Sequence, residues 1–262
     1  MSLPERTEAN PPCGAGLHVY AEGGPWITAA AEHIAGVAAE SIKARGRFTL
    51  VLAGGATPRP VYVRLALAGA GGLDWPRVHL LFGDERCVPP DDGRSNFTMV
   101  RQALLDHVPV PPANIHRIRG EDEPGRAAAD YARELRRLLA GEDGPDPAPA
   151  LDLVLLGLGE DGHTASLFPG LAAVGETRRW VAAEYVPAAG MWRVTLTLAL
   201  INAARNVTFL VTGTGKAAIL REVLEGPRQP ARLPAQAVAP AHGVLRWLVD
   251  VPAAAALENH RG

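Results

Sequence analysis

Residues 151–169, LDLVLLGLGEDGHTASLFP, carry the pattern that decides the fold class. The segment begins as a nearly uninterrupted apolar run over 151–157 and then changes abruptly to glycines and acids. A short continuous apolar run is typical of a strand that is buried on both faces of a parallel sheet. The polar residues that follow therefore lie at a strand's carboxyl end, where open α/β sheets bind their ligands.

Similar apolar runs alternate with helix-like stretches along the rest of the chain. Strands are expected at 17–21, 48–53, 78–83, 206–213 and 244–250, and helices at 25–45, 58–67, 95–105, 124–140 and 216–226. The runs 180–186 and 192–198 alternate polar and apolar residues, as a half-exposed antiparallel pair does. The pattern predicts an α/β fold: a doubly wound, mostly parallel sheet with helices on both faces, three-layered and Rossmann-like, plus a small antiparallel elaboration.

The expected domain organisation is simple. Residues 17–252 are predicted to form one α/β domain with a small lobe around 175–200, between flexible tails at 1–16 and 253–262. The first tail lacks an apolar core and does not read as a signal peptide. The polar, proline-rich stretch 141–150 is expected to be a connector.

Composition excludes several function classes. The chain has 262 residues, a formal net charge of −2 and no long basic run, so neither nucleic acid nor a membrane is expected as a partner. Cys13 and Cys87 are too few for a disulfide scaffold, which favours a cytoplasmic location, and Cys87 is expected to be an inert thiol. A monomer or weak homo-oligomer is expected.

The glycines of the opening stretch admit a dinucleotide-binding interpretation, because Gly157, Gly159 and Gly162 match G-x-G-x-x-G. Two features oppose it. Glu160 and Asp161 put negative charge where a pyrophosphate would lie. A dinucleotide loop also opens a long helix, whereas the proline and glycine at 169–170 would end one after about two turns.

A catalytic interpretation fits the same stretch better. Asp161 lies two residues before His163, and a carboxylate beside an imidazole selects its tautomer and raises its basicity, as a general base requires. From the residues alone, catalysis by His163 and a purely structural or exposed histidine remain equally open.

Three other strand ends carry candidate binding residues, each with a structural alternative. A phosphate cradle before a helix N-terminus is expected, or else a tight turn, at Gly54, Gly55, Ala56 and Thr57. Asp84 and Arg86 would contact hydroxyls and an anionic group, or form a solvated charged loop, and Ser95 is expected to cap the helix that contains Asn96.

Lys216 follows the last of these strand ends. Lys216 is expected either to bind a phosphate or to be an exposed surface lysine. A Walker A loop is ruled out, because Leu210 stands where that motif has its first glycine and Ala217 where it has serine or threonine. No H-E-x-x-H, C-x-x-C or G-x-S-x-G motif occurs, so neither a metal site nor an esterase nucleophile elbow is expected.

Taken together and in this order, the segments resemble the 6-phosphogluconolactonases over roughly residues 17–250. They are AGGATP (53–58), GDERCVP (83–89) with the serine and asparagine at 95–96, GLGEDGHTASLFP (157–169), RVTLT (193–197) and GTGKA (213–217). The chain departs from the family pattern at Ala53, where serine is usual. The resemblance implies hydrolysis of 6-phospho-D-glucono-1,5-lactone to 6-phosphogluconate in the oxidative pentose phosphate pathway, without metal or organic cofactor.

The resemblance also implies roles for these residues. His163 would take a proton from the attacking water, and Asp161 would orient and stabilise the imidazole. The substrate would be held by Gly54, Gly55, Ala56, Thr57, Asp84, Arg86, Asn96, Arg193 and Lys216. How Arg86 and Arg193 divide the phosphate and the lactone carbonyl is left open.

Two alternatives are weaker. A glucosamine-6-phosphate deaminase of the same superfamily would need an acid in the tail at 164–169, which has none. A sugar-phosphate sensor would carry a DNA-binding helix-turn-helix, for which the first 16 residues are too short, and it would have no need of His163.

Overall fold

The centre of the molecule is an eight-stranded sheet, seen here in a computed structural model that describes residues 8–9, 16–69, 72–140 and 150–258. The strands run in the order β1-β2-β11-β10-β7-β3-β4-β6. Their bounds are β1 Glu8–Ala9, β2 Gly16–Tyr20, β3 Phe48–Leu52, β4 Val78–Phe82, β6 Ile115–His116, β7 Leu153–Leu156, β10 Asn206–Val211 and β11 Val244–Asp250. Every neighbouring pair is parallel except β1 with β2, so the predicted mostly parallel sheet is confirmed.

The apolar run of the opening stretch forms the middle of this sheet. Strand β7 lies between β10 and β3, and all of its residues are buried, as are all those of β3. Burial on both faces explains why these strands are apolar at every position rather than at alternate positions.

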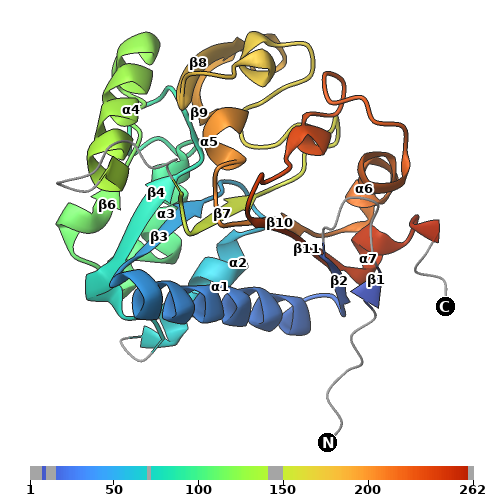
Figure 1. Cartoon of the computed structure of the whole chain (residues 1–262), viewed down its shortest axis with the longest axis horizontal. Coiled ribbons are helices and arrows are strands. Elements are labelled where there is room, and N and C mark those ends of the chain that lie inside the picture. The colour runs from blue at the N-terminus through green and yellow to red at the C-terminus, as the bar shows by residue number, and fades with distance from the viewer. Residues whose placement is uncertain (1–7, 10–15, 70–71, 141–149, 259–262) are drawn as a thin grey trace, which may run out of the picture.

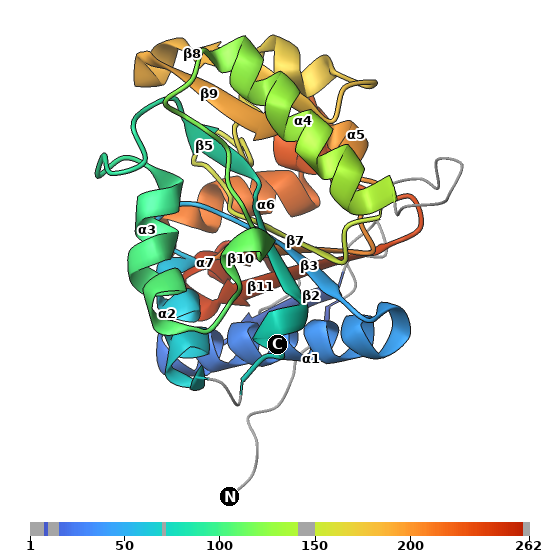
Figure 2. The same ribbon diagram turned by 90° about the vertical axis from the view of Figure 1, so that its left-hand side faces the viewer.

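Helices cover the sheet on two sides. They are α1 Gly24–Arg45, α2 Arg59–Leu67, α3 Asn96–Ala103, α4 Pro124–Ala140, α5 Leu198–Ile201, α6 Ala217–Glu225 and α7 Val251–Ala254. Figures 1 and 2 show α1 and α2 below the sheet and α4 above it, which confirms the three layers. Helix α1 has a proline in its first turn and ends at Gly46 in the left-handed conformation, as expected. None of the helices described could serve as a membrane-spanning segment.

A second, three-stranded antiparallel sheet lies beside α4 and is the predicted antiparallel elaboration. Its order is β5-β9-β8, with bounds β5 Asp84–Arg86, β8 Val181–Val186 and β9 Met191–Leu196. The expectation of a loop at 84–86 is therefore wrong. Three residues carry no readable periodicity, and the strand exists because Glu85 pairs with Val194 more than a hundred positions away.

The expected tails also need correction. Gly16 is the first residue of β2 and pairs with Arg246 of β11, and residues 8–9 form β1. Strand structure therefore extends into the predicted N-terminal tail. At the other end Asp250 caps α7 through the Ala253 N–H, and Leu257 is buried. The alanine-rich end shows no periodicity that would predict this packing. Most of the connector at 141–150 lies outside the described residues.

A buried carboxylate joins the strands at the amino edge of the sheet. Asp152, just before β7, accepts hydrogen bonds from the Thr49 backbone N–H at 2.8 Å and the Thr49 hydroxyl at 3.0 Å. The Arg45 guanidinium at the end of α1 lies 2.7 Å away. This cluster is at the opposite edge from the polar loops described next, so it serves folding rather than chemistry.

Candidate active site

The candidate site forms where parallel strands end. β3, β7 and β10 are neighbours or next neighbours in the sheet, so the loops that leave their carboxyl ends meet at one edge. These loops carry the glycines at 54–55, the Asp161–His163 stretch and Lys216. The strand order thus brings together residues as far apart in the chain as Gly54 and Lys216. Figure 1 shows β3, β7 and β10 side by side in the sheet.

Asp161 contacts His163 at both its ring and its backbone. One carboxylate oxygen, Oδ1, lies 2.5 Å from the ring Nδ1 and accepts the His163 backbone N–H at 3.1 Å. Burial raises the pKa of Asp161, but the backbone hydrogen bond and the charge interaction with His163 outweigh it and leave the pKa below its ordinary value. An ionised Asp161 favours a proton on Nδ1 and leaves Nε2 free to accept one.

Two glycines give the catalytic loop its shape. A Cβ on Gly159 would lie 2.0 Å from the His163 Nδ1, so only glycine leaves room for the imidazole. Gly162 has φ +82° and faces Leu233 so closely that its Cβ would lie 2.6 Å from a methyl carbon. The loop closes through the Gly159 N–H, which donates to the His163 carbonyl at 2.8 Å.

No helix follows this loop within 157–170, so the short helix expected there is wrong. The chain instead turns at Ala165, which has φ +49°, and Thr164 bridges to Leu167. A dinucleotide-binding loop would place its phosphates at a helix N-terminus, which this segment lacks.

The predicted phosphate cradle is in contact with two neighbouring elements. The Asn96 side chain packs on Gly54 so closely that a Cβ there would lie 2.0 Å from Oδ1. Gly55 adopts φ +94°, and the Thr212 hydroxyl after β10 donates to the Thr57 hydroxyl at 3.4 Å. Asn96 is held at the start of α3, where Ser95 accepts the Thr98 N–H, so the predicted cap is confirmed.

Asp84 is a buried junction. Its Oδ1 accepts from the Asn96 side-chain amide at 3.1 Å, and its Oδ2 accepts from the Ser166 hydroxyl at 2.6 Å. The Arg193 guanidinium lies 3.9 Å from Oδ2. Asp84 therefore ties α3, the catalytic loop and β9 together, and much of its accepting capacity is already used by protein groups.

The two candidate arginines stand side by side. Arg86 and Arg193 are paired across β5 and β9. Arg193 is only 14% exposed, which lowers its pKa, and its guanidinium carbon lies 5.6 Å from the centre of the Phe168 ring. Arg86 donates to the Arg94 carbonyl, and the Nε atoms of both arginines are buried without a protein partner. The Arg86 guanidinium forms no ion pair with Asp84 or Glu85, although its backbone N–H donates to the Glu85 carboxylate at 2.7 Å.

Lys216 reaches the catalytic loop. Its Nζ lies 3.9 Å from the Glu160 carboxylate. The lysine is the last residue of a short 3-10 turn that follows Gly213, which has φ +91°, and it immediately precedes α6. The Gly213 N–H donates to the buried carboxylate of Asp250 at 3.0 Å, which fixes the turn. A cation thus stands between the turn after β10 and the residues that precede His163.

Sequence reasoning missed a buried acid that holds the site's frame. Glu85 is 2% exposed and accepts hydrogen bonds from the Ser95 hydroxyl and from the backbone N–H groups of Arg86, Asn96 and Phe97. Burial raises the pKa of Glu85, against the opposing effect of these bonds. The position of Glu85 between Asp84 and Arg86 is a signal that could have pointed to it. Its hydrogen-bond partners at 95–97 are brought to it only by the fold.

Cys87 follows this frame. It is a free, partly buried thiol, and burial raises its pKa to about 11, so little reactive thiolate forms near neutral pH. The expectation of an inert thiol agrees with this environment.

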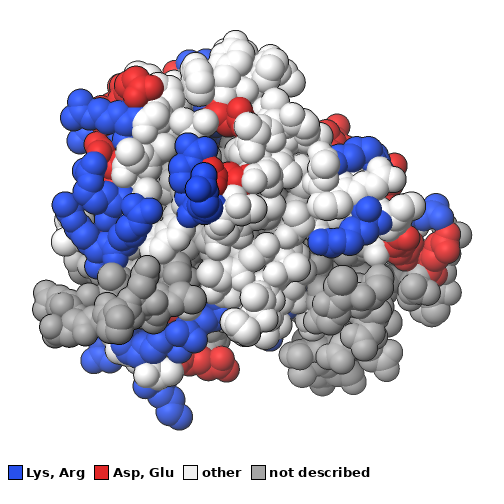
Figure 3. Space-filling model, turned by 45° about the horizontal axis from the view of Figure 1, so that its top comes forward, with Lys and Arg blue, Asp and Glu red and all other residues white. Residues whose placement is uncertain are grey.

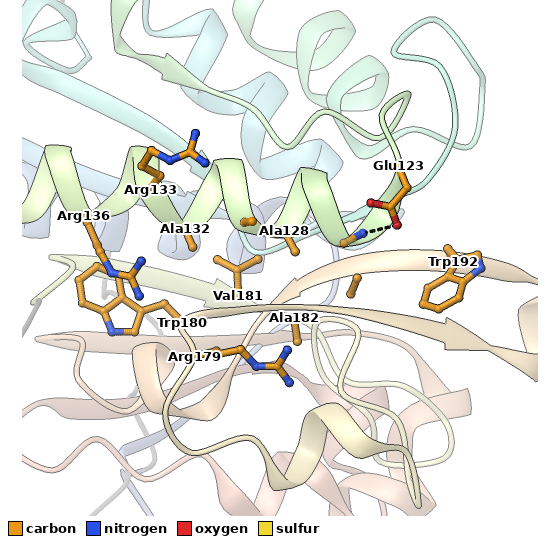
Figure 4. Close-up of a pocket in the computed structure, with 13 residues that line it drawn as sticks. Glu123, Ala128, Ala132, Arg133, Arg136, Arg179, Trp180, Val181, Ala182 and Trp192 are labelled. Atoms are coloured by element: carbon orange, nitrogen blue, oxygen red, sulfur yellow. Dashed lines mark hydrogen bonds between the residues drawn. The ribbon is translucent and has the colours of Figure 1, made fainter.

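A separate groove of about 570 Å³ runs between α4 and β8 and is lined by none of the predicted site residues. Figure 4 shows Arg133, Arg136, Arg179 and two tryptophans along it, with the Arg136 guanidinium 5.3 Å from the centre of the Trp180 ring. In Figure 3 basic side chains gather on the side where α4 lies. Among the described residues no histidine lines the groove, whereas the Asp161–His163 pair lies at the loop edge.

The fold and the loop edge define a class: an α/β protein with a glycine cradle, a lysine and an Asp–His pair at the carboxyl ends of its strands. The family model described as glucosamine-6-phosphate isomerases/6-phosphogluconolactonase matches residues 25–247. The chain belongs to this family.

Named relatives agree with this membership. The chain is 40% identical to the 6-phosphogluconolactonase of Nostoc sp. over 83% of its own length and 88% of the relative, and 42% identical to that of Homo sapiens over 80% and 81%. The crystal structure of 6-phosphogluconolactonase from Thermotoga maritima matches with a TM-score of 0.76 and 30% identity, over 89% of this chain and 98% of that one. The resemblance to the 6-phosphogluconolactonases is confirmed, as is the predicted enzyme class.

Proposed function

We propose that this chain hydrolyses 6-phospho-D-glucono-1,5-lactone to 6-phosphogluconate in the oxidative pentose phosphate pathway, with His163 as general base. The observation that carries the proposal is the 2.5 Å contact between Asp161 and the His163 ring at the end of β7. It leaves the opposite ring nitrogen available at the edge where the cradle and Lys216 lie. Family membership supplies the substrate class.

This geometry supports the following reaction. The Nε2 of His163 takes a proton from a water molecule, whose oxygen forms a bond to C1 of the lactone. The carbonyl electrons move to an oxyanion, and Asp161 stabilises the imidazolium. When the oxyanion collapses, the bond from C1 to the ring oxygen breaks and His163 returns the proton to that oxygen. General base assistance contributes about 10²–10⁴-fold to such a step.

The positions of the other site residues support the following binding roles. The backbone N–H groups at 54–57 and Lys216 are assigned to the 6-phosphate, because a glycine turn before a helix and a cation both favour a dianion. Arg193 is assigned to the lactone side, because its guanidinium and the His163 ring contact the same phenylalanine. Arg86 and Asn96 are assigned to the part of the substrate between the 6-phosphate and the lactone ring, because Arg86 lies beside Arg193 and Asn96 packs on Gly54.

The direct test is hydrolysis of freshly prepared 6-phosphogluconolactone, followed against its spontaneous opening. We expect a rate that rises in proportion to enzyme concentration and acid release equal to lactone consumed. A rate equal to the background at every enzyme concentration would contradict the proposed function. Release of ammonia from glucosamine-6-phosphate would favour the deaminase alternative.

Replacing Lys216 by alanine is expected to raise KM for the phosphorylated lactone about 10- to 100-fold, because a charge-assisted bond worth about 1.5–3 kcal/mol is lost. The value of kcat should stay within about threefold, since the lysine interacts alike with substrate and transition state. Steady-state kinetics with glucono-1,5-lactone, which lacks the phosphate, should be unchanged by the substitution.

Lys43→Ala is the matched control, because Lys43 is exposed in the last turn of α1. It should leave KM unaltered for both lactones. An equal loss on both lactones in the Lys216 variant would place the lysine elsewhere than on the phosphate.

A further inference from the structure

An aromatic ring covers one face of the candidate base. The Phe168 and His163 ring centres lie 4.1 Å apart and their planes differ by 26°, so the two rings are nearly parallel. Asp161 meanwhile holds the imidazole at one edge, through Nδ1. One contact therefore restrains an atom of the imidazole and the other restrains its plane.

We propose that Phe168 is a positioning residue for the reaction, which keeps the His163 imidazole aimed at the attacking water and stabilises the imidazolium as it forms. The proposal rests on the proposed function of His163. It goes beyond that function, because no role for Phe168 follows from the Asp161–His163 pair alone.

The restraint is needed because the outer torsion of a histidine side chain has a broad, shallow energy profile. A hydrogen bond to Nδ1 leaves the ring free to tilt about that contact, and tilting moves Nε2 away from the water. A flat ring stacked at 4.1 Å removes this freedom. Loss of alignment slows a proton transfer without weakening the binding of a phosphate that is held elsewhere.

The electrostatic part follows from the charge distribution of an aromatic ring, whose face is negative and attracts a cation. The neutral imidazole gains little from that face, whereas the imidazolium gains more. The base is therefore stabilised in its protonated form.

Other charged groups also face the base. Asp161 and Glu160 lie in its own loop, Lys216 reaches Glu160 from the turn after β10, and Arg193 approaches the same phenyl ring from β9. The Arg193 charge is opposed by Asp84 at 3.9 Å. A change at Phe168 alone leaves all of these groups in place.

The backbone turn that delivers Phe168 is anchored from outside the loop. Ser166 is fully buried, donates its hydroxyl to Asp84 at 2.6 Å, and donates its backbone N–H to the Thr195 hydroxyl at 3.2 Å. With Ala165 at φ +49°, this anchoring folds the chain back so that Phe168 lies against His163. These hydrogen bonds at Ser166 therefore hold in place the backbone that positions the Phe168 ring.

Phe168→Leu tests the proposal. We expect kcat to fall about tenfold and KM to stay within about twofold, because alignment is lost while phosphate binding is kept. Phe168→Tyr keeps the ring face and should restore kcat, and Phe168→Met, a ring-free variant of similar volume, should repeat the leucine result.

Tyr185→Leu is the matched control, since Tyr185 is an exposed aromatic residue in β8 whose ring contacts Trp192 edge to face, 5.7 Å between ring centres, rather than His163. It should change neither kcat nor KM. An unchanged kcat in the leucine and methionine variants would overturn the role of Phe168, and so would a tyrosine variant as impaired as they are. A fully active His163→Ala enzyme would instead overturn the proposed base, so the two failures are distinguishable.

Discussion

His163→Ala is expected to lower kcat for 6-phosphogluconolactone by about 10²–10⁴-fold, because the group that takes the proton from water is removed. Binding should survive, since the cradle and Lys216 are separate from the imidazole. The inhibition constant of 6-phosphogluconate is therefore expected to stay within several-fold of the unsubstituted protein. The value of kcat is measured from initial rates on fresh lactone, corrected for spontaneous opening. The inhibition constant is measured from the decrease in the remaining enzymatic rate as 6-phosphogluconate is added.

His242→Ala controls for the loss of a histidine as such, because His242 is exposed in the loop before β11. It should retain full activity. Turnover near that of the unsubstituted protein in His163→Ala would show that another group activates the water. A parallel loss of activity and of 6-phosphogluconate binding would show that the substitution had collapsed the loop rather than removed a base.

Asp152→Ala is expected to lower the free energy of unfolding by about 3–5 kcal/mol, the range found when one partner of a buried ion pair is removed. The carboxylate is 3% exposed, and without it the Thr49 N–H and the Arg45 guanidinium lose their acceptor. Urea unfolding followed by tryptophan fluorescence at several pH values measures the change. The folded fraction should keep normal kcat, because the cluster is at the edge of the sheet away from His163.

Asp106→Ala is the comparison for this prediction, because Asp106 is exposed and lies 4.0 Å from Arg101. Its removal should cost less than about 1 kcal/mol, as for surface ion pairs in general. Asp152→Asn keeps one accepting oxygen and should fall between the two. A loss below about 1 kcal/mol in Asp152→Ala would mean that water replaces the carboxylate at little cost.

Local patterns predicted the regular elements well where one element carried its own signal. The bounds of α4 agree with the expected helix at 124–140, and Ser95 caps α3 as its side chain and position indicated. Continuous apolar runs identified β3 and β7, because burial on both faces removes the need for alternation. Each of these signals lies within a few residues of the element that it predicts.

Patterns failed where distant partners decide the local conformation. The strand at 84–86 exists because β9 supplies its hydrogen bonds. The expected helix after Gly162 is replaced by a turn that Asp84 and Thr195 anchor through Ser166. Neither partner is within reach of a local window, and backbone groups take whichever hydrogen bonds the whole fold offers.

The sequence by itself determined the fold class, the family and the edge of the sheet at which the chemistry must lie, because parallel strands necessarily bring their carboxyl ends together. Only the tertiary structure decided which side chains touch there. In the folded chain Asp84 accepts hydrogen bonds from Ser166 and Asn96. Lys216 lies beside the Glu160 carboxylate, and the Phe168 ring stacks on the His163 ring. Such contacts depend on backbone turns and rotamers that are settled by packing across the whole chain, and a linear pattern carries no record of them.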